Sequence, residues 1–452
     1  MTSFSATLAQ LGDILAAPIV NDSPSLMGTS SGAICTDSRE LRPGDVFLAL
    51  RGDNFDGHGF VATAKEGGAI AAIVDHPLKV ALPQLIVKDT LAAYQAIAQW
   101  WRNQVSATII AVTGSVGKTT TKELIAAVLG CYGSVLKTEA NNNNEIGVPK
   151  TLLHLTHDHD YAVIEMGMRG PGEIALLGSI AQPDIGVITN VGTAHIGRLG
   201  SRQAIAEAKC ELLAQLRPKG TAVLNGENDL LMATAPQVWS GATITYGLTT
   251  GQLRGHIIPD NRLQVGDYAF PLPLVGEHHA LNYLAAIAVA RACHLDLAPL
   301  QAGITLTLPK GRGGRYTLRN DIVLLDETYN AGLESMVASL RLLAAMPPGT
   351  RRGAVLGAMR ELGDYAIPFH YQVGEEVSRL GLDYLVVLDD GSEGEALIAG
   401  AQSTPSQRFD THDQVIDYLK GEIEPGDRIL FKASHSVGLD RVVQALRQEF
   451  QG

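Results

Sequence analysis

The chain has 452 residues and a formal net charge of −12 at pH 7, and 46% of its residues are hydrophobic. A chain of this length exceeds one compact core, so we expect roughly three domains of about 150 residues each. The acidic balance, without a block of Lys or Arg, argues against a nucleic-acid-binding surface, because such surfaces need clustered positive charge.

The cysteines and the apolar runs limit the cellular setting. The four cysteines form no C-x-x-C pair, so the sequence indicates neither a zinc site nor a disulfide framework. The N-terminus lacks a basic signal-peptide region, and no apolar run approaches the ~18 residues that span a bilayer. We therefore expect a protein of the reducing cytoplasm without membrane insertion. We also expect it to act as a monomer.

The first 88 residues contain short strand candidates. Residues 46–50 follow a Pro-Gly turn, and residues 69–74 follow a pair of glycines. Between them, residues 51–58 form a polar, Gly-rich loop of the kind that contacts ligands. This pattern predicts a small α/β domain.

Strand and helix patterns alternate through the next section, residues 89–311. The β-branched run 108–113 is a buried-strand candidate, and further candidates lie at 161–165, 184–189 and 221–225. Each is followed by Gly or polar residues and then a helical pattern. The alternation predicts a mostly parallel sheet.

A dense group of Gly and basic residues at 309–315 marks the boundary to a third section, residues 312–452. Four more strand candidates alternate with helical patterns there, at 321–325, 353–356, 384–388 and 428–431. They predict a second parallel-sheet domain.

The run VTGSVGKTTTK, residues 112–122, almost matches a phosphate-binding loop. Val112 stands where the G-x-x-x-x-G-K pattern needs its first Gly, and Gly114 comes two residues later. A glycine turn between strand and helix places backbone N–H groups and the helix dipole toward phosphate oxygens. Lys118 adds a positive charge, and Thr119 offers a hydroxyl to a phosphate-bound Mg²⁺. This context favours a nucleotide site over an ordinary glycine turn.

Two side chains at strand ends are candidates for the same site. Glu165 ends an apolar strand, at the edge where open α/β sheets bind ligands, and its carboxylate could hold Mg²⁺. A solvated Glu explains the pattern equally well. His195 follows the strand at 184–189, although a lone His more often packs or donates a hydrogen bond than binds a ligand.

Lys209 falls on the apolar face of a helix that is predicted to start near Ser201. That face, at ~100° per residue, carries Ile205, Ala208, Leu212, Leu213 and Leu216. A surface lysine that reaches past the apolar face to water is one interpretation. The other is a partly desolvated amine whose lowered pKa leaves it neutral and reactive.

Two runs are rich in hydrogen-bonding side chains. TEANNNNEIGVP, residues 138–149, places four Asn before a Gly-x-Pro turn, which suits either a structural turn or the recognition of a polar substrate. DETYN, residues 326–330, offers carboxylates, an aromatic face and an amide. It could hold a ribose and a base, or form a solvated loop.

Together these runs resemble the Mur ligase family. The resemblance covers nearly the whole chain, through TDSRELRPGDVFLALRGDNFDGHGF, TGSVGKTTTKE, NNNNEIGVP, IEMGMRGPGEI, NVGTAHIGRLGS, AEAKCELL, VGEHHALNYLAA, DETYNAG and FKASHSVGLDRVV. The short loop T-G-x-x-G-K-T is this family's own form of the phosphate-binding loop. NNEIGVP with GPGEI points to the member that adds D-alanyl-D-alanine.

The resemblance implies a three-domain α/β fold. Residues 1–88 would bind the UDP-sugar (UDP-MurNAc), residues 89–311 would form a central P-loop ATPase domain with a mostly parallel sheet, and residues 312–452 a Rossmann-like ligase domain. In the implied reaction, ATP phosphorylates the terminal carboxylate of UDP-N-acetylmuramoyl-tripeptide. The amine of D-alanyl-D-alanine then attacks the acyl phosphate, and ADP and phosphate are released. The product would serve peptidoglycan synthesis, and through it cell shape and cell division.

The resemblance also assigns roles to residues. The implied ATP-binding set is Gly114, Ser115, Val116, Gly117, Lys118, Thr119, Thr120, Asn282, Arg315, Asp326, Glu327, Tyr329 and Asn330. Two Mg²⁺ ions are implied, with contacts from Thr119, Glu165, His195 and Lys209. Lys209 matches a lysine that CO₂ carbamylates in related ligases. The implied catalytic set is Lys118, Lys209, Glu165 and His195, and the substrate-binding set is Ser38, Arg39, Asn143, Asn144 and His435.

The chain departs from the family's pattern at four positions, which are His279, Glu327, Gly332 and His435. A neutral His cannot offer the fork of an Arg to a carboxylate, so His435 changes the expected contact to the incoming peptide. Two other ligases remain as alternatives, the tripeptide-forming Mur ligase and a folylpolyglutamate-type ligase, and the Asn run and GPGEI argue against both. A regulatory P-loop ATPase is a further alternative, which the substrate-contact candidates of the first domain disfavour.

Overall fold

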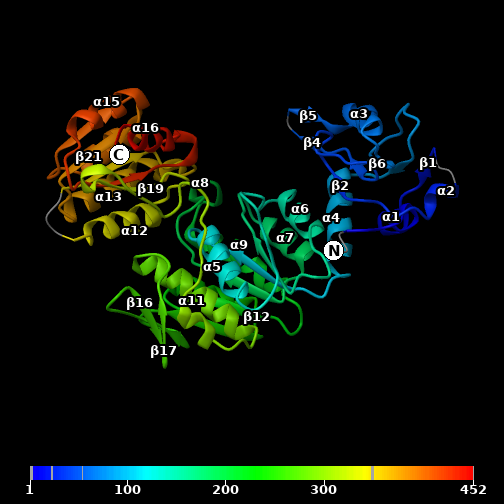
Figure 1. The fold of residues 1–452 in the computed structure, drawn as a ribbon, viewed down its shortest axis with the longest axis horizontal. Coiled ribbons are helices and arrows are strands. Elements are labelled where there is room, and N and C mark those ends of the chain that lie inside the picture. The colour runs from blue at the N-terminus through cyan, green and yellow to red at the C-terminus, as the bar shows by residue number, and fades with distance from the viewer. Residues whose placement is uncertain (1–3, 22–23, 53, 348–350, 451–452) are drawn as a thin grey trace.

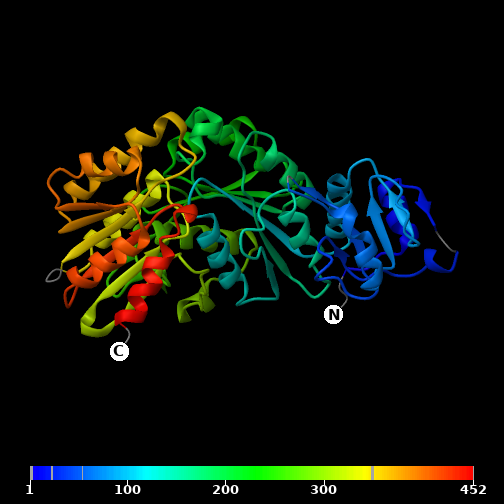
Figure 2. The same ribbon diagram turned by 90° about the horizontal axis from the view of Figure 1, so that it is seen from above.

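Three α/β domains follow one another along the molecule in the computed structural model, which describes residues 4–21, 24–52, 54–347 and 351–450. The N-terminal domain lies at one end, the C-terminal domain at the other and the central domain between them (Figures 1 and 2). The predicted three-domain α/β fold with mostly parallel sheets is confirmed. No helix of the described residues combines the length and apolar content needed to cross a bilayer.

The N-terminal domain is built on a five-stranded sheet in the order β1-β7-β6-β3-β2, in which only β1 runs antiparallel to its neighbour. Its strands are β1 (Ile19–Val20), β2 (Ile34–Cys35), β3 (Val46–Leu48), β6 (Ala71–Val74) and β7 (Gln84–Ile86). A small hairpin and four helical segments complete it, namely β4 (Arg51–Gly52), β5 (Phe55–Asp56), α1 (Leu8–Leu15), α2 (Pro24–Met27), η1 (Gly57–Phe60) and α3 (Val61–Glu66).

The central domain contains a seven-stranded, fully parallel sheet in the order β14-β13-β12-β11-β8-β10-β9. Its strands are β8 (Thr108–Thr113), β9 (Val135–Lys137), β10 (Tyr161–Glu165), β11 (Ile185–Ile188), β12 (Thr221–Asn225), β13 (Ala242–Gly247) and β14 (Leu253–Arg254). A separate antiparallel sheet consists of β15 (His256–Ile258), β16 (Arg262–Val265) and β17 (Tyr268–Pro271).

Helices cover both faces of the central sheet because successive side chains of a strand point to opposite faces. Ile110 and Val112 of β8 pack into one core with α5 (Lys118–Leu129) and α11 (Glu277–Ala292). Ile109 and Ala111 pack into another with α4 (Thr90–Arg102), α6 (Gly147–Leu153), α7 (Glu173–Ala181) and α9 (Arg202–Ala214). The remaining helical segments are α8 (Ile196–Leu199), α10 (Asp229–Thr234), η2 (Ala235–Gln237) and η3 (Ala298–Ala302).

The C-terminal domain has a six-stranded sheet in the order β18-β19-β23-β20-β21-β22, with only β18 antiparallel. Its strands are β18 (Gly314–Thr317), β19 (Val323–Glu327), β20 (Arg352–Gly357), β21 (Tyr384–Leu388), β22 (Ser406–Phe409) and β23 (Arg428–Lys432). Its helical segments are η4 (Arg319–Asp321), α12 (Leu333–Ala344), η5 (Gly363–Tyr365), α13 (Ala366–Arg379), α14 (Ser392–Gly400), α15 (His412–Glu422), η6 (His435–Val437) and α16 (Asp440–Phe450).

The order of the central strands brings the expected site residues to one edge. β8 lies between β10 and β11, with Glu165 paired to Val112 and Ile188 paired to Thr113. Since parallel strands all end at the same edge, the phosphate-loop candidate after β8, Glu165 at the end of β10 and the segment after β11 meet there.

Buried Arg102, at the end of α4, ties three elements of the central domain together. Its guanidinium donates to the carbonyl of Ala181 at 2.8 Å, to the carbonyl of Gln182 at 3.1 Å and to Asp184 Oδ2 at 3.0 Å. We expect Arg102→Met to lower the free energy of unfolding by about 3 kcal/mol, because the acceptors lose a buried partner. Urea unfolding measures this. Arg217→Met is the control, since its partly exposed contacts with Asp184 and Asn103 should contribute less than about 1 kcal/mol. Equal effects of the two substitutions would contradict the prediction.

Candidate nucleotide and ligation site

A cleft of about 840 Å³ lies between the central and C-terminal domains. Both domains line it, the central one through the loop after β8 and the C-terminal one through the ends of β19 and β23. Most of the residues expected from the sequence line it, namely Ser115, Val116, Gly117, Lys118, Thr119, Thr120, Asn143, Asn144, Glu165, His195, Asn282, Glu327, Tyr329, Asn330 and His435.

The loop between β8 and α5 has the geometry of a phosphate cradle. Gly117 caps α5 with φ of 81°, a left-handed conformation that favours glycine, and an added Cβ would lie 2.8 Å from Asn282 Oδ1. The side chain of Asn190 braces the loop by accepting from the Val116 N–H at 3.0 Å. Lys118 Nζ donates to the carbonyl of Gly114 at 2.8 Å, and desolvation lowers its pKa. The ammonium of Lys118 therefore lies against the loop that precedes it, at the N-terminus of α5. The N-terminus of a helix favours the binding of anions.

Glu165 is 2% exposed and has one carboxylate oxygen without a hydrogen-bond partner among the described residues. Its Oε1 accepts from Asn143 Nδ2 at 2.8 Å, whereas Oε2 lies 4.0 Å from Lys122 Nζ. Buried polar atoms are nearly always paired, so a carboxylate oxygen in the lining of this cleft that lacks a hydrogen-bond partner fits a metal ligand.

Lys209 is 1% exposed, which confirms that it lies within the apolar face of α9. No described residue forms a hydrogen bond or an ion pair with its amine. Burial lowers the pKa of Lys209 well below its usual value, and the charge of Lys118 lowers it further. Both effects favour the neutral, nucleophilic form of the Lys209 amine.

His195 reaches the cleft from the segment between β11 and α8. Its Nδ1 lies 2.6 Å from Glu361 Oε2 of the C-terminal domain. Desolvation lowers the pKa of His195, the charge of Lys118 adds to this effect, and Glu361 opposes it. The sequence reasoning missed Glu361, although it follows β20 and the strand-end rule that selected Glu165 would also have selected it.

An aromatic stack forms the C-terminal wall of the cleft. The Tyr329 ring contacts the Arg312 guanidinium, which lies 4.0 Å from its centroid, and stacks with the His435 ring, whose centroid is 5.2 Å away. Arg312 lines the cleft, whereas Arg315, the arginine expected from the sequence, is exposed on β18 and does not line it. Glycines on both sides of Arg312 turn the chain there, and this turn brings Arg312 to Tyr329.

Two acidic residues that precede Tyr329 in the sequence, Asp326 and Glu327, are held by different contacts. Asp326 is buried and accepts from Thr328 Oγ1 at 2.6 Å, and it does not line the cleft. Glu327 lines it, accepts from the Gly313 N–H at 3.0 Å and lies 3.9 Å from Lys432 Nζ. The two acidic residues therefore have different environments, and of the two only Glu327 faces the cleft.

Two adjacent histidines at the start of α11 also line the cleft. Burial lowers the pKa of His278 to about 3 and that of His279 to about 4, so both are neutral at pH 7. His279 Nδ1 is buried and has no hydrogen-bond partner among the described residues. This departure from the family's pattern leaves a polar atom available to a ligand.

Ser38 and Arg39 lie in the N-terminal domain, in the turn after β2, and do not line the cleft. The Arg39 side chain is exposed and forms an ion pair with Asp37 at 2.6 Å. A bound substrate that touched both regions would have to extend from the N-terminal domain to the cleft (Figure 1).

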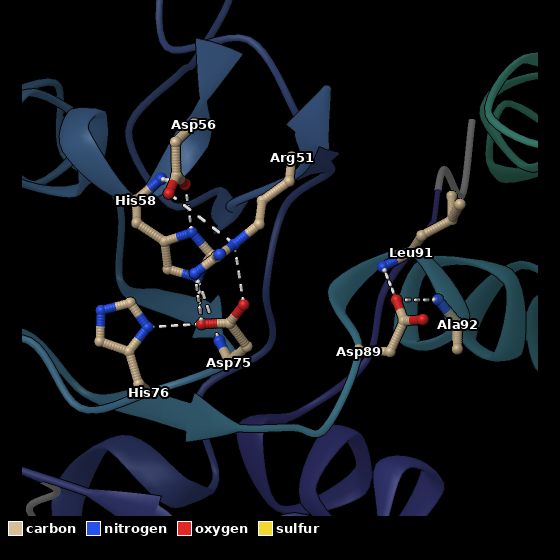
Figure 3. A network of polar contacts seen from close by, with 8 residues as sticks. All are labelled: Arg51, Asp56, His58, Asp75, His76, Asp89, Leu91 and Ala92. Atoms are coloured by element: carbon tan, nitrogen blue, oxygen red, sulfur yellow. Dashed lines mark hydrogen bonds and ion pairs between the residues drawn. The ribbon is translucent and has the colours of Figure 1, made fainter. Parts of the chain in front are cut away.

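A second polar cluster lies at the end of β6 (Figure 3). His58 Nδ1 donates to Asp56, and its Nε2 accepts from the Asp75 N–H at 3.1 Å. The carboxylate of Asp75 also contacts His76 Nδ1 at 2.5 Å and Arg51 Nε at 3.0 Å. The side chains of His58, Asp75 and His76 lie close enough to hold a metal ion. The nearby guanidinium and the occupied Nε2 argue for a structural role, in which these contacts hold Arg51 and His58 against the end of β6.

Three family models match the chain. They are the Mur ligase family catalytic domain over residues 32–111, the Mur ligase middle domain over 112–290 and the Mur ligase glutamate ligase domain over 311–435.

The chain is also similar to characterised relatives. A UDP-N-acetylmuramoyl-tripeptide--D-alanyl-D-alanine ligase of Synechocystis is 58% identical over 92% of both chains. A crystal structure of MurF from Acinetobacter baumannii matches 99% of this chain and 100% of its own, with a TM-score of 0.91 and 31% identity. That of Thermotoga maritima MurF ligase in complex with ADP matches 93% and 98%, with a TM-score of 0.84 and 29% identity. The chain therefore belongs to the Mur ligase family.

Proposed function

We propose that this chain is an ATP-dependent ligase that joins D-alanyl-D-alanine to UDP-N-acetylmuramoyl-tripeptide in peptidoglycan synthesis. Its relatives of that name match it over nearly their whole length. The observation that carries the proposal is the cleft, which is lined by a phosphate cradle and by a buried Glu165 whose Oε2 has no hydrogen-bond partner among the described residues. The buried Lys209 amine does not line the cleft, but it lies near enough to feel the charge of Lys118.

The reaction requires activation of a carboxylate, because its oxygen is a poor leaving group. Transfer of the γ-phosphoryl group of ATP gives an acyl phosphate, and the dipeptide amine then displaces phosphate to form the amide bond. Catalysis of such a transfer consists mostly of positioning and of charge stabilisation. The backbone N–H groups around Gly117 and the ammonium of Lys118 supply both, once phosphate draws that ammonium away from the Gly114 carbonyl.

The donor set around the cleft fits Mg²⁺. Oxygen ligands are available from the hydroxyl of Thr119 and from Oε2 of Glu165, which has no hydrogen-bond partner among the described residues. We propose that His195 also contacts the metal. Two bound Mg²⁺ ions would neutralise charge that develops on the phosphate oxygens. Asn143 holds Glu165 Oε1, so Oε2 stays directed away from that amide.

We propose that Lys209 carries a carbamate. The neutral amine attacks CO₂, a C–N bond forms and one proton leaves to water, which converts an unpaired amine into an anion. The charge of Lys118 would attract the carbamylated side chain of Lys209, whereas it would repel a protonated one. The carbamate would also add an oxygen donor in the neighbourhood of Lys118 and His195, the two cleft residues whose charges interact with that of Lys209.

Other contacts follow from the positions of the domains. Asn282, Tyr329 and Arg312 line the cleft, and we propose that they hold the nucleoside of ATP. We propose that Asn143, Asn144 and His435, which also line it, approach the reacting peptide. We propose that residues 1–88 bind the UDP-sugar through Ser38 and Arg39, that residues 89–311 bind ATP and that residues 312–452 close the cleft. We also propose that the chain acts as a monomer.

The decisive experiment measures phosphate release from ATP with each acceptor supplied singly and together. We expect release only when UDP-N-acetylmuramoyl-tripeptide and D-alanyl-D-alanine are both present, with one phosphate released for each pentapeptide formed. Release that needs neither substrate would instead indicate a regulatory ATPase. Release with a dipeptide acceptor and a free amino acid would indicate a tripeptide-forming ligase.

A further inference from the structure

His195 and Glu361 join the central domain to the C-terminal domain at the edge of the cleft. His195 Nδ1 lies 2.6 Å from Glu361 Oε2, and Glu361 Oε1 accepts from Arg198 at 3.3 Å. Thr193, on the same segment, donates to Glu334 at the start of α12 at 3.0 Å. Two carboxylates of one domain thus hold a short segment of the other.

The backbone at both ends of the His195–Glu361 contact is strained. His195 has φ of 65° and Glu361 has φ of 64°, both in the left-handed region that residues other than glycine rarely adopt. Strain of this kind persists where the surrounding structure imposes it, and it gathers at functional sites. Here each strained residue presents its side chain to the other across the domain boundary.

The contact leaves little room for adjustment. A Cβ on Gly197 would lie 2.5 Å from the backbone nitrogen of Gly363, so the two backbones touch. Ile196 and Leu362, next to these glycines, are buried at 3% exposure each. The position of Glu361 relative to His195 is therefore set by packing as well as by the hydrogen bond.

The hydrogen bond selects one tautomer of the imidazole. A carboxylate oxygen accepts and does not donate, so Nδ1 of His195 carries the proton. Nε2 is then left with its lone pair for a ligand. Carboxylates that bind the second nitrogen of a ligand histidine fix its orientation and raise its basicity in this way.

We propose that Glu361 is a positioning residue, which fixes the orientation and the tautomer of His195 from the C-terminal domain. The phosphate edge of the site is then complete only when the two domains are in contact. This inference rests on the proposed placement of His195 in the metal-contacting set.

The test compares Glu361→Ala and Glu361→Gln in the full chain. In ¹⁵N-histidine spectra of the wild type, we expect the His195 proton on Nδ1, whereas Glu361→Ala should shift it toward Nε2. Electron paramagnetic resonance with Mn²⁺ and ADP should show at least tenfold weaker Mn²⁺ binding in Glu361→Ala. Glu361→Gln keeps an acceptor oxygen and should stay within threefold. Glu395→Gln, which removes a surface carboxylate paired with Arg408 at 3.3 Å, is the matched control and should change neither readout.

A further variant separates positioning from a structural role. Glu361→Gly suits the left-handed backbone, so we expect its unfolding temperature to equal or exceed that of the wild type while Mn²⁺ binding weakens as in Glu361→Ala. A lower unfolding temperature would assign Glu361 a structural role and overturn the inference. Unchanged Mn²⁺ binding and an unchanged tautomer in Glu361→Ala would overturn it as well, with the ligase assignment intact. That assignment fails on the wild type alone, if phosphate release does not need both substrates.

Discussion

Lys209→Met is expected to lower the rate of ligation at least about a thousandfold, equivalent to about 4 kcal/mol in the barrier, because the proposed carbamate cannot form. The same substitution should not destabilise the protein. It replaces a buried amine that has no partner among the described residues by an apolar chain of similar length. Steady-state phosphate release measures the first effect, and thermal unfolding measures the second.

Lys209→Arg is the informative companion, since it keeps a cation but offers no amine to CO₂. It should be as inactive as Lys209→Met and less stable, because an arginine cannot become neutral in the same surroundings. With ¹³CO₂, the wild type should give a carbamate signal that Lys209→Arg lacks. Full activity in enzyme whose Lys209 is shown to be unmodified would refute the carbamate.

Glu165→Gln is expected to raise the Mg²⁺ concentration for half-maximal activity at least about tenfold and to lower the maximal rate about a hundredfold. The reason is that Oε2, the oxygen without a hydrogen-bond partner among the described residues, loses its charge and its proposed role as a metal ligand. The amide oxygen can still accept from Asn143, so unfolding free energy should change by less than about 1 kcal/mol. Activity measured against Mg²⁺ concentration, together with urea unfolding, tests both parts.

Glu173→Gln serves as the control for this experiment. Glu173 also lines the cleft, but its carboxylate accepts from the Arg169 N–H at 2.7 Å, so it has a structural partner already. We expect its Mg²⁺ dependence to match that of the wild type. An equal shift in both variants would show that the general negative charge of the cleft, and not the position of Glu165, determines metal binding.

Much of the fold is predictable because it depends on local patterns. The strands at 161–165, 221–225 and 384–388 coincide with β10, β12 and β21, since short apolar runs between turn residues leave few alternatives. The position of Glu165 followed from the rule that parallel strands end at one edge. For Lys209, periodicity predicted the apolar face but left two interpretations open. Only the packing around α9 shows that the side chain does not reach water.

Contacts between domains could not be predicted from the sequence, because the spacing of residues along the chain does not show which loops face each other. Glu361 lies 166 positions from His195, and nothing local marks it as its partner. The choice between Arg312 and Arg315 depended on the two left-handed glycines that flank Arg312, Gly311 with φ of 74° and Gly313 with φ of 60°. These turn the chain so that the first arginine meets Tyr329 and the second lies outside the cleft.

Because two domains form the cleft, the affinity of an inhibitor for it depends on the fraction of molecules in which these domains are in contact. If the closed arrangement were populated only one tenth of the time, a compound that binds it would appear about tenfold weaker than its contacts warrant. Any substitution that holds the domains apart, such as a side chain added at Gly197, would impose the same loss. Resistance to a drug that fills this cleft could therefore arise at positions the drug never touches, and a useful screen would include them.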